Sequence, residues 1–146
     1  MAATAGNNVA GRGRTVPEIL ALAFGAIYTL IGIIGFFITG FENFFAHTDK
    51  TLLGFEINGM HNVVHILIGV AGLALARTLA GARSYGWLLA VGYGAAFVYG
   101  LFATGKDWDF LSLNWADNIL HLATVLVGLV IALMPVRHAV DAGRVR

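Results

Sequence analysis

Two pairs of potential metal-binding side chains stand four residues apart in otherwise apolar stretches of this sequence. His61 and His65 form the first pair, and Asp117 and His121 form the second. Residues four apart lie on one face of an α-helix, so each pair can direct both side chains toward one point. Imidazole and carboxylate groups are common ligands of zinc and related divalent metals. The spacing therefore permits a metal site in which all four side chains close a tetrahedral shell, as in structural zinc sites.

A second interpretation needs no metal, because amides and hydroxyls surround these pairs. Asn and His side chains can hydrogen-bond between helices and clamp a bundle, together with an ion pair between His61 and Asp117. Interhelical bonds of this kind contribute on average less than about 1 kcal/mol in membranes. The tyrosines are expected either to bond the asparagines or to pack with a satisfied hydroxyl. The structural polar cluster predicted in this way consists of Asn58, Asn62, Asn114, Asn118, Tyr28 and Tyr93.

Two further alternatives use the same side chains. His65 and His121 could be the axial ligands of a haem b, because they hold equivalent places in their segments. Gly72 and Gly128 could make room for the macrocycle, but they could equally let helices pack closely, and one place cannot serve both uses. A proton or ion path would need polar groups across the whole bilayer. Beyond His65 the same helix face offers only glycine and alanine, so such a path ends in the outer third.

The elements that position these side chains are apolar helices. The 146-residue chain is 58% hydrophobic and 12% charged, whereas a soluble domain is nearer a quarter charged. Residues 19–41, 57–76, 84–105 and 118–136 contain no Asp, Glu, Lys or Arg, and each run is close to the roughly 20 residues that cross a bilayer as a helix. We therefore predict an all-α, polytopic membrane protein with four transmembrane helices, at about 17–41, 57–77, 84–105 and 115–136.

The charged residues predict how the chain crosses the membrane. Basic side chains gather on one side of the predicted helices, at Arg12, Arg14, Arg77, Arg83, Arg137, Arg144 and Arg146. The loops on the other side are acidic on balance, so the positive-inside rule places both termini in the cytoplasm. Residues 1–15 are predicted to be a disordered cytoplasmic N-terminus, and residues 137–146 a basic cytoplasmic tail. The chain has no cysteine and a net charge of +1, which excludes thiolate metal sites and points to no nucleic-acid partner.

The sequence also contains an internal repeat. A shift of 56 residues places the Asn, Asn and His of NGMHNVVH (58–65) on those of NWADNILH (114–121). A shift of 65 residues places GFFITG (35–40) on GLFATG (100–105) and pairs Tyr28 with Tyr93. Parallel repeats of this kind are related by an axis along the membrane normal. We therefore predict two tandem helical hairpins, with both polar segments at one depth near the extracytoplasmic side.

The motifs H-N-x-x-H-x-x-x-G, from residue 61, and N-x-x-D-N-x-x-H, from residue 114, resemble a bacterial membrane-protein family catalogued as domain of unknown function 4383. The residues that match are Asn58, His61, Asn62, His65, Gly69, Asn114, Asp117, Asn118 and His121. The resemblance covers roughly residues 28–133. It implies a four-helix bundle in a bacterial inner (plasma) membrane, and it implies no particular activity.

The sequence indicates no catalytic apparatus. It contains no phosphate-binding loop, nucleophile–base pair or dinucleotide-binding fingerprint. We therefore expect a non-enzymatic protein, a small structural or accessory subunit of a larger membrane assembly. Its expected partners are the lipid bilayer and either other membrane-protein subunits or a second copy of itself. The alternative is a protein that binds a divalent metal, or haem b in second place, through the polar cluster.

Overall fold

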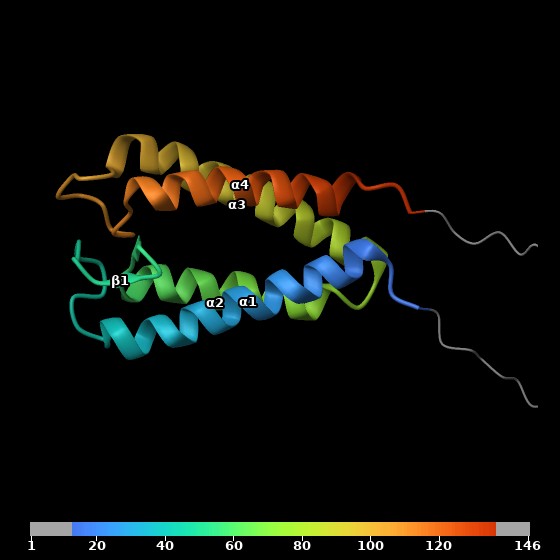
Figure 1. Ribbon diagram of the computed structural model, residues 1–146, viewed down its shortest axis with the longest axis horizontal. Helices are drawn as coiled ribbons and strands as arrows, with labels where there is room; N and C mark the ends of the chain where they lie inside the picture. Colours follow the sequence, from blue (N-terminus) through green and yellow to red (C-terminus); the bar gives the residue numbers. More distant parts are fainter. Residues whose placement is uncertain (1–12, 137–146) are drawn as a thin grey trace, which may run out of the picture.

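The computed structural model describes residues 13–136, and they form a bundle of four helices with a small β-hairpin at one end (Figure 1). In chain order the elements are α1 (Val16–Thr39), β1 (Thr51–Leu52), β2 (Phe55–Glu56), α2 (Gly59–Leu75), α3 (Leu79–Ala103) and α4 (Trp115–Leu133). The prediction of an all-α bundle of four helices is confirmed, apart from the hairpin. Most of the predicted N-terminal segment and the whole predicted tail, 137–146, lie outside the described residues.

Three of the helices are long and apolar enough to cross a membrane, namely α1, α3 and α4. Helix α2 has 17 residues and is about 26 Å long, shorter than the roughly 30 Å hydrocarbon core. Of the four helices expected to span the membrane, three are therefore long and apolar enough to do so, and the fourth is shorter. The fourth is shortened because the side chain of Asn58 caps it, accepting the N–H of His61 at 2.9 Å. The residues before this cap form loop and β-hairpin.

The predicted start of the third helix at residue 84 is wrong by five residues. Helix α3 begins at Leu79, after a cap in which the Thr78 side chain accepts the N–H of Gly81 at 3.0 Å. Absence of charge was the criterion for the predicted boundary, and it placed Arg83 in a loop. A long arginine near a helix end can keep its charge at the membrane surface, so a charge does not end a helix there.

The β-hairpin is absent from the sequence-based expectation. Thr51 pairs with Glu56, and Leu52 pairs with Phe55. The two residues of its turn, Leu53 and Gly54, have φ angles of 55° and 90°. Positive φ at both central residues is typical of the tight turns that join two strands. A segment this short shows no alternation that would reveal a strand in advance.

Glycines let the helices pack closely within each of the two helical hairpins, α1 with α2 and α3 with α4. A Cβ on Gly25 of α1 would lie 2.7 Å from the backbone nitrogen of Leu73 in α2. A Cβ on Gly86 of α3 would lie 2.6 Å from the backbone nitrogen of Ala132 in α4. Both distances are too short for a real side chain, so the contacts are backbone against backbone. Gly72 and Gly128 belong to these same contacts, Gly72 against Gly25 and Gly128 against α3.

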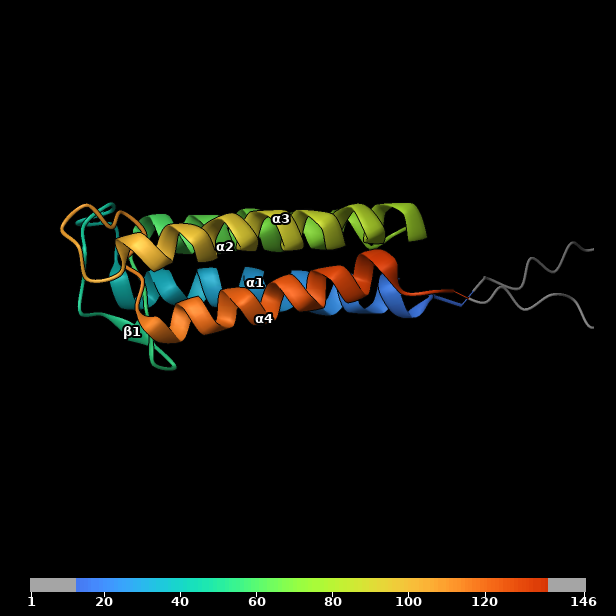
Figure 2. The same ribbon diagram turned by 90° about the horizontal axis from the view of Figure 1, so that it is seen from above.

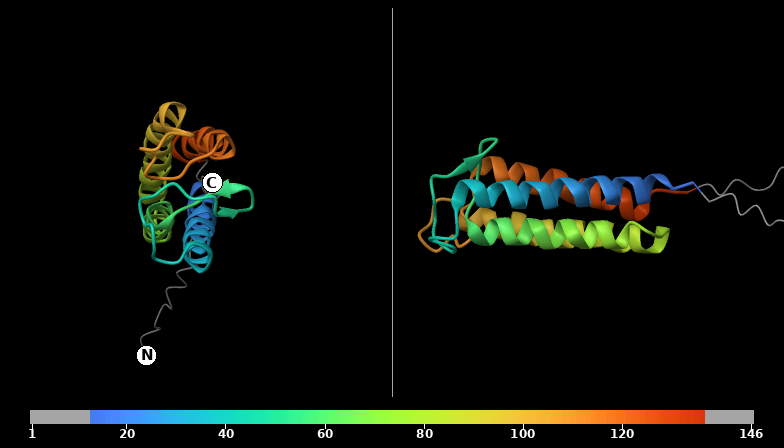
Figure 3. Two further views of the ribbon diagram at one scale, coloured as in Figure 1. Left: turned by 90° about the vertical axis from the view of Figure 1, so that its left-hand side faces the viewer. Right: turned by 90° about the horizontal axis from the view of Figure 1, so that it is seen from below.

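The two hairpins then lie side by side. Figure 1 shows α1 and α2 below α3 and α4, and Figure 2 shows α2 and α3 on one side with α1 and α4 on the other. Seen along the bundle, α2 and α4 are diagonal (Figure 3). Between these two described helices no Cα atoms approach within 8 Å. Only side chains can bridge the diagonal, and those of His61, Asp117 and His121 approach one another across it.

Candidate metal centre

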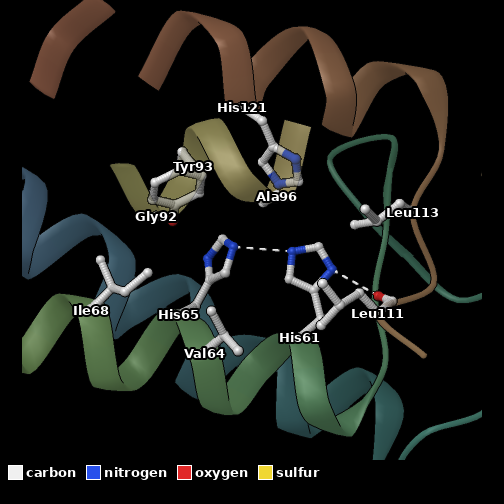
Figure 4. Close-up of a pocket in the computed structure, with 10 residues that line it drawn as sticks. All are labelled: His61, Val64, His65, Ile68, Gly92, Tyr93, Ala96, Leu111, Leu113 and His121. Atoms are coloured by element: carbon white, nitrogen blue, oxygen red, sulfur yellow. Dashed lines mark hydrogen bonds between the residues drawn. The ribbon is translucent and has the colours of Figure 1, made fainter. Parts of the chain in front are cut away.

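The side chains of His61, Asp117 and His121 converge in the interior, near the end of the bundle that carries the β-hairpin. Each offers one ligand atom such that the three atoms lie within 4.8 Å of one another. All three residues are buried, with 5%, 2% and 4% of their surface exposed. His61 comes from α2 and the other two come from α4, and Figure 4 shows the imidazoles facing one another between these helices. The structure therefore brings together three of the four ligands that the spacing suggested.

His65 lies beside this group rather than in it. Its Nε2 atom is 3.1 Å from the Nε2 atom of His61, and the ring centroids are 4.7 Å apart. Two nitrogens that bind one tetrahedral zinc ion lie about 3.3 Å apart, given the usual bond length. The observed separation fits an N–H···N hydrogen bond, and it also fits two ligands of one ion. The fourth predicted ligand is therefore within reach of the centre.

The hydrogen bond at the far side of the His61 ring sets its protonation. The Nδ1 atom is 3.2 Å from the carbonyl oxygen of Leu111. A carbonyl can only accept, so Nδ1 carries the hydrogen in the neutral ring and Nε2 presents its lone pair to the interior. Metal-binding histidines are commonly held in this way, with the second nitrogen donating to a carbonyl or carboxylate. The ring of His61 is thus held in the orientation that a metal ligand would need.

A buried aspartate holds the loop that supplies this carbonyl. The carboxylate of Asp109 accepts the N–H groups of Leu111 at 3.1 Å and Leu113 at 2.7 Å, and the hydroxyl of Tyr99 at 3.2 Å. Asp109 is 1% exposed. From the sequence, Asp109 is only one of the acidic loop residues that favour the extracytoplasmic side. The Asp-x-x-x-x-Asn spacing before α4 does not reveal this role, because the loop geometry depends on how this loop packs against the loop that follows α1.

His65 and His121 each leave a buried nitrogen without a partner. In residues 13–136 the Nδ1 atoms of both rings have no hydrogen-bond partner. Leaving a buried polar atom unpaired costs roughly 1–3 kcal/mol. Both residues are more than nine-tenths buried, at 7% and 4% exposed. An unpaired buried nitrogen of this kind can be satisfied by a bound ligand or ion.

Asp117 has two roles that the sequence did not separate. Its carboxylate accepts the backbone N–H of Asn114 at 2.9 Å, while the Asn114 side chain accepts the N–H of Asp117 at 3.0 Å. This reciprocal capping box begins α4. Each carboxylate oxygen has two acceptor positions, so the cap leaves capacity for a cation. The predicted ion pair with His61 is not formed, because no ion pair within 4.0 Å joins Asp117 to a described Lys, Arg or His.

The asparagines bind threonines and loop carbonyls rather than histidines. The side-chain amide of Asn62 donates to the hydroxyl of Thr39 at 2.9 Å, and that of Asn118 donates to Thr104 at 2.9 Å. These two bonds join neighbouring helices within each hairpin. Asn58 caps α2 and also donates to the carbonyls of Ala46 at 3.0 Å and Phe110 at 2.8 Å. The asparagines therefore join helices and loops, but the predicted side-chain bonds between asparagine and histidine are not found in residues 13–136.

The tyrosines fill the centre of the bundle below the histidines. Tyr28 and Tyr93 stack with ring centroids 5.4 Å apart, and the Tyr28 ring meets that of His65 edge-on at 5.3 Å. The hydroxyl of Tyr28 is 2.8 Å from that of Thr124. Of the two roles foreseen for Tyr28, packing with a satisfied hydroxyl is the one found. The sequence does not predict the bond to Thr124, because a single threonine in an apolar helix gives no local sign of its partner.

The space around the histidines is too small for a macrocycle. The pocket that His65 and His121 share has a volume of about 170 Å³, whereas cofactor and ligand sites usually measure about 300–1,000 Å³. Tyr93 lines the same pocket and occupies space next to His121, with ring centroids 5.4 Å apart. A haem between these histidines would require the hairpins to separate. The geometry favours a single ion over haem.

Comparison with known proteins bears on the family. Residues 18–134 match the family model described as "Domain of unknown function (DUF4383)". No curated protein and no solved structure matches the chain. The match includes all four helices apart from the first two residues of α1, and it contains every residue of the polar cluster. The chain therefore belongs to the DUF4383 family, as its two Asn/His motifs suggested.

Proposed function

We propose that this protein binds one divalent transition-metal ion between α2 and α4, with His61, Asp117 and His121 as ligands. His65 lies within reach of the ion but outside its set of three ligands. The convergence of two imidazoles and a carboxylate within 4.8 Å, all buried, is the observation that carries the proposal. Neutral imidazole and carboxylate suit zinc, and imidazole also suits copper, iron and nickel. Burial of an ion here is supported by the negative carboxylate, which has no cationic partner within 4.0 Å in the described chain.

Metal binding would require a small contraction of the site. Ligands on one tetrahedral zinc ion lie about 3.3 Å apart, so the side chains that are 4.8 Å apart would close by up to about 1.5 Å. Because α2 and α4 touch only through side chains here, rotation about side-chain bonds can supply this movement without moving the backbone. The Leu111 carbonyl keeps the His61 ring aimed correctly during it.

Elemental analysis of the purified full-length protein tests the proposal. The protein is purified in mild detergent with an affinity tag that contains no histidine, loaded with zinc and freed of loosely bound ions. We expect one zinc ion per protein. His61→Ala and His121→Ala should each weaken binding about 10- to 100-fold, at least as much as loss of a residue that merely orients a ligand. His47→Ala is the matched control, because that side chain is 40% exposed in a loop. A metal content far below one ion per protein, or an equal loss of metal affinity in His47→Ala, would refute the site.

We also infer that the two hairpins are a tandem repeat. Asn58 and Asn114 cap α2 and α4, and Asn62 and Asn118 bond a threonine of the preceding helix at the same distance, 2.9 Å. The same asparagines also occupy the space that the missing side chains of Gly35 and Gly100 leave. These paired contacts support the repeat that the shifts of 56 and 65 residues suggested.

The proposed orientation has both termini in the cytoplasm of a bacterial cell. The start of α1, the end of α4 and the turn between α2 and α3 lie at one end of the bundle (Figure 1), and this arrangement supports a common side for them. The basic residues near that end, including Arg77 and Arg83, favour the cytoplasmic face. An accessory role in a larger membrane assembly stays a second prediction, since the exposed apolar side chains on all four helices suit another protein as well as lipid.

Cysteine labelling checks this orientation, because the chain has no cysteine of its own. In intact cells a membrane-impermeant maleimide should label Asp49→Cys and leave Arg77→Cys unlabelled, although both positions are exposed. After lysis both variants should react, which controls for accessibility. The reverse pattern in intact cells would invert the proposed topology.

A further inference from the structure

A side pocket adjoins the candidate metal centre. It has a volume of about 170 Å³ and lies between α2, α3 and α4, with His61, His65 and His121 on its wall (Figure 4). Leu111 and Leu113 line it at the end next to the loops. An apolar cavity of about 150 Å³ is large enough to hold benzene. The pocket therefore has room for a small ring or a molecule of that size.

The pocket has a polar floor and an apolar rim. His65, Tyr93 and His121 at the floor are buried. The rim consists of half-buried residues from α2 and α3, namely Val64, Ile68, Gly92 and Ala96. All four stand within the charge-free runs 57–76 and 84–105, so the rim faces the side of the bundle that lipid would cover. A molecule entering there must leave water first, which favours a small, uncharged one.

An ion in the proposed centre would have one side facing this pocket. His61 and His121 line the pocket, whereas Asp117 does not. Asp117 instead lines a smaller hollow of about 50 Å³ on the other side of His61, toward α1 and the β-hairpin. The carboxylate would thus hold the ion from one side. With His65 off the ion and its ring against Tyr28, the fourth coordination position would face the pocket that His61 and His121 line. Zinc with three protein ligands usually keeps its fourth position for water or an external ligand.

We propose that a small, uncharged, lipid-soluble molecule with a nitrogen or oxygen lone pair enters between α2 and α3 and occupies this fourth position. The inference rests on the proposed metal centre and adds the class of ligand that the centre receives. It also changes the role of the ion. An ion with four protein ligands stabilises the fold, whereas an ion with an open coordination position facing an apolar pocket can bind an external ligand.

Gly92 provides a way to close the pocket without disturbing the helices. A Cβ at this position would meet no atom within 4 Å, so Gly92→Phe can place its ring in the mouth without a backbone clash. Ala96→Phe closes the same mouth from one turn further along α3. Val91→Phe is the matched control, because Val91 is 68% exposed on the neighbouring lipid-facing surface. This substitution adds the same ring outside the pocket.

Pyridine is a suitable probe, since it is uncharged, about the size of benzene and a nitrogen ligand. The full-length protein is loaded with Co²⁺, whose visible bands report its ligands, and cobalt content is measured for every variant. We expect pyridine to shift the bands saturably in the wild type and in Val91→Phe. The shift should be lost in Gly92→Phe and Ala96→Phe while both retain cobalt.

The outcomes separate the two proposals. If the wild type retains no cobalt or zinc, the metal centre itself is refuted and this inference falls with it. If cobalt is retained but pyridine causes no shift, the metal centre stands and the open position is wrong. An unchanged pyridine shift in both pocket variants would likewise overturn entry between α2 and α3. So would an azide-induced shift that survives in both pocket variants, because that anion would have reached the ion through water.

Discussion

Replacing Gly25 by valine should lower the free energy of unfolding by about 3 kcal/mol, the upper part of the usual range for overpacking. The added Cβ would lie 2.7 Å from the Leu73 nitrogen, 2.9 Å from the Gly69 oxygen and 2.9 Å from the Gly72 carbonyl carbon. All three are backbone atoms, so no side chain can rotate away. Helix α1 would have to move off α2 at this contact. Equilibrium unfolding in mixed detergent micelles measures the change.

Gly92→Val is the control for this prediction. A Cβ there meets nothing within 4 Å, and valine is a slightly better helix former than glycine. Its stability should therefore equal or slightly exceed that of the wild type. If Gly25→Val unfolds at the same detergent fraction as Gly92→Val, the close contact of α1 with α2 is not a feature of the folded protein.

Asn58→Ala should also cost about 3 kcal/mol, because one side chain makes three hydrogen bonds. Loss of an N-cap costs about 1 kcal/mol, and up to about 2. Loss of the donors to Ala46 and Phe110 adds about 1 kcal/mol each, the net value of a typical hydrogen bond. Asn58 is fully buried, so water does not readily reach the carbonyls and the N–H that its loss leaves unpaired. The Phe110 carbonyl is next to Leu111, which orients His61, so metal affinity should fall along with stability.

Asn114→Ala provides the matched comparison, since Asn114 holds the equivalent place before α4. It caps that helix, but its amide donates only to the exposed Gly54 carbonyl, at 2.9 Å. We therefore expect a loss of about 1 kcal/mol, mainly the cap. The same unfolding measurement decides the order. If Asn114→Ala proves as damaging as Asn58→Ala, the bonds from Asn58 to the loops contribute little.

The asymmetry between the two hairpins is the most informative feature of the centre. The first carries His61 where the second carries Asp117, although the flanking asparagines correspond. A symmetric site with two such histidine pairs would carry no negative charge to offset the charge of a buried ion. In the proposed centre the Asp117 carboxylate would supply negative charge for a buried divalent ion, and it also caps α4 by accepting the N–H of Asn114. One residue of the second half would then serve both as a helix cap and as a ligand.

The sequence by itself determined the class of the protein and the contents of its interior. Charge-free runs predicted the helices, because hydrocarbon tolerates only segments that satisfy their own backbone. The helical period placed Asn58, His61, Asn62 and His65 on one face, and all four are buried. The motifs also pointed to the family. These properties depend on residues close together in the chain, so local reasoning could reach them.

Only the tertiary structure decided which of these side chains meet. The diagonal placement of α2 and α4 brings His61 to Asp117 and His121, and it sends the asparagines to threonines of neighbouring helices instead. The Leu111 carbonyl reaches His61 across 50 residues of chain, and no periodicity encodes that contact. Glycine positions show that helices approach, but not which ones. Such partners depend on how hairpins and loops pack in three dimensions, which is why the site became visible only in the folded chain.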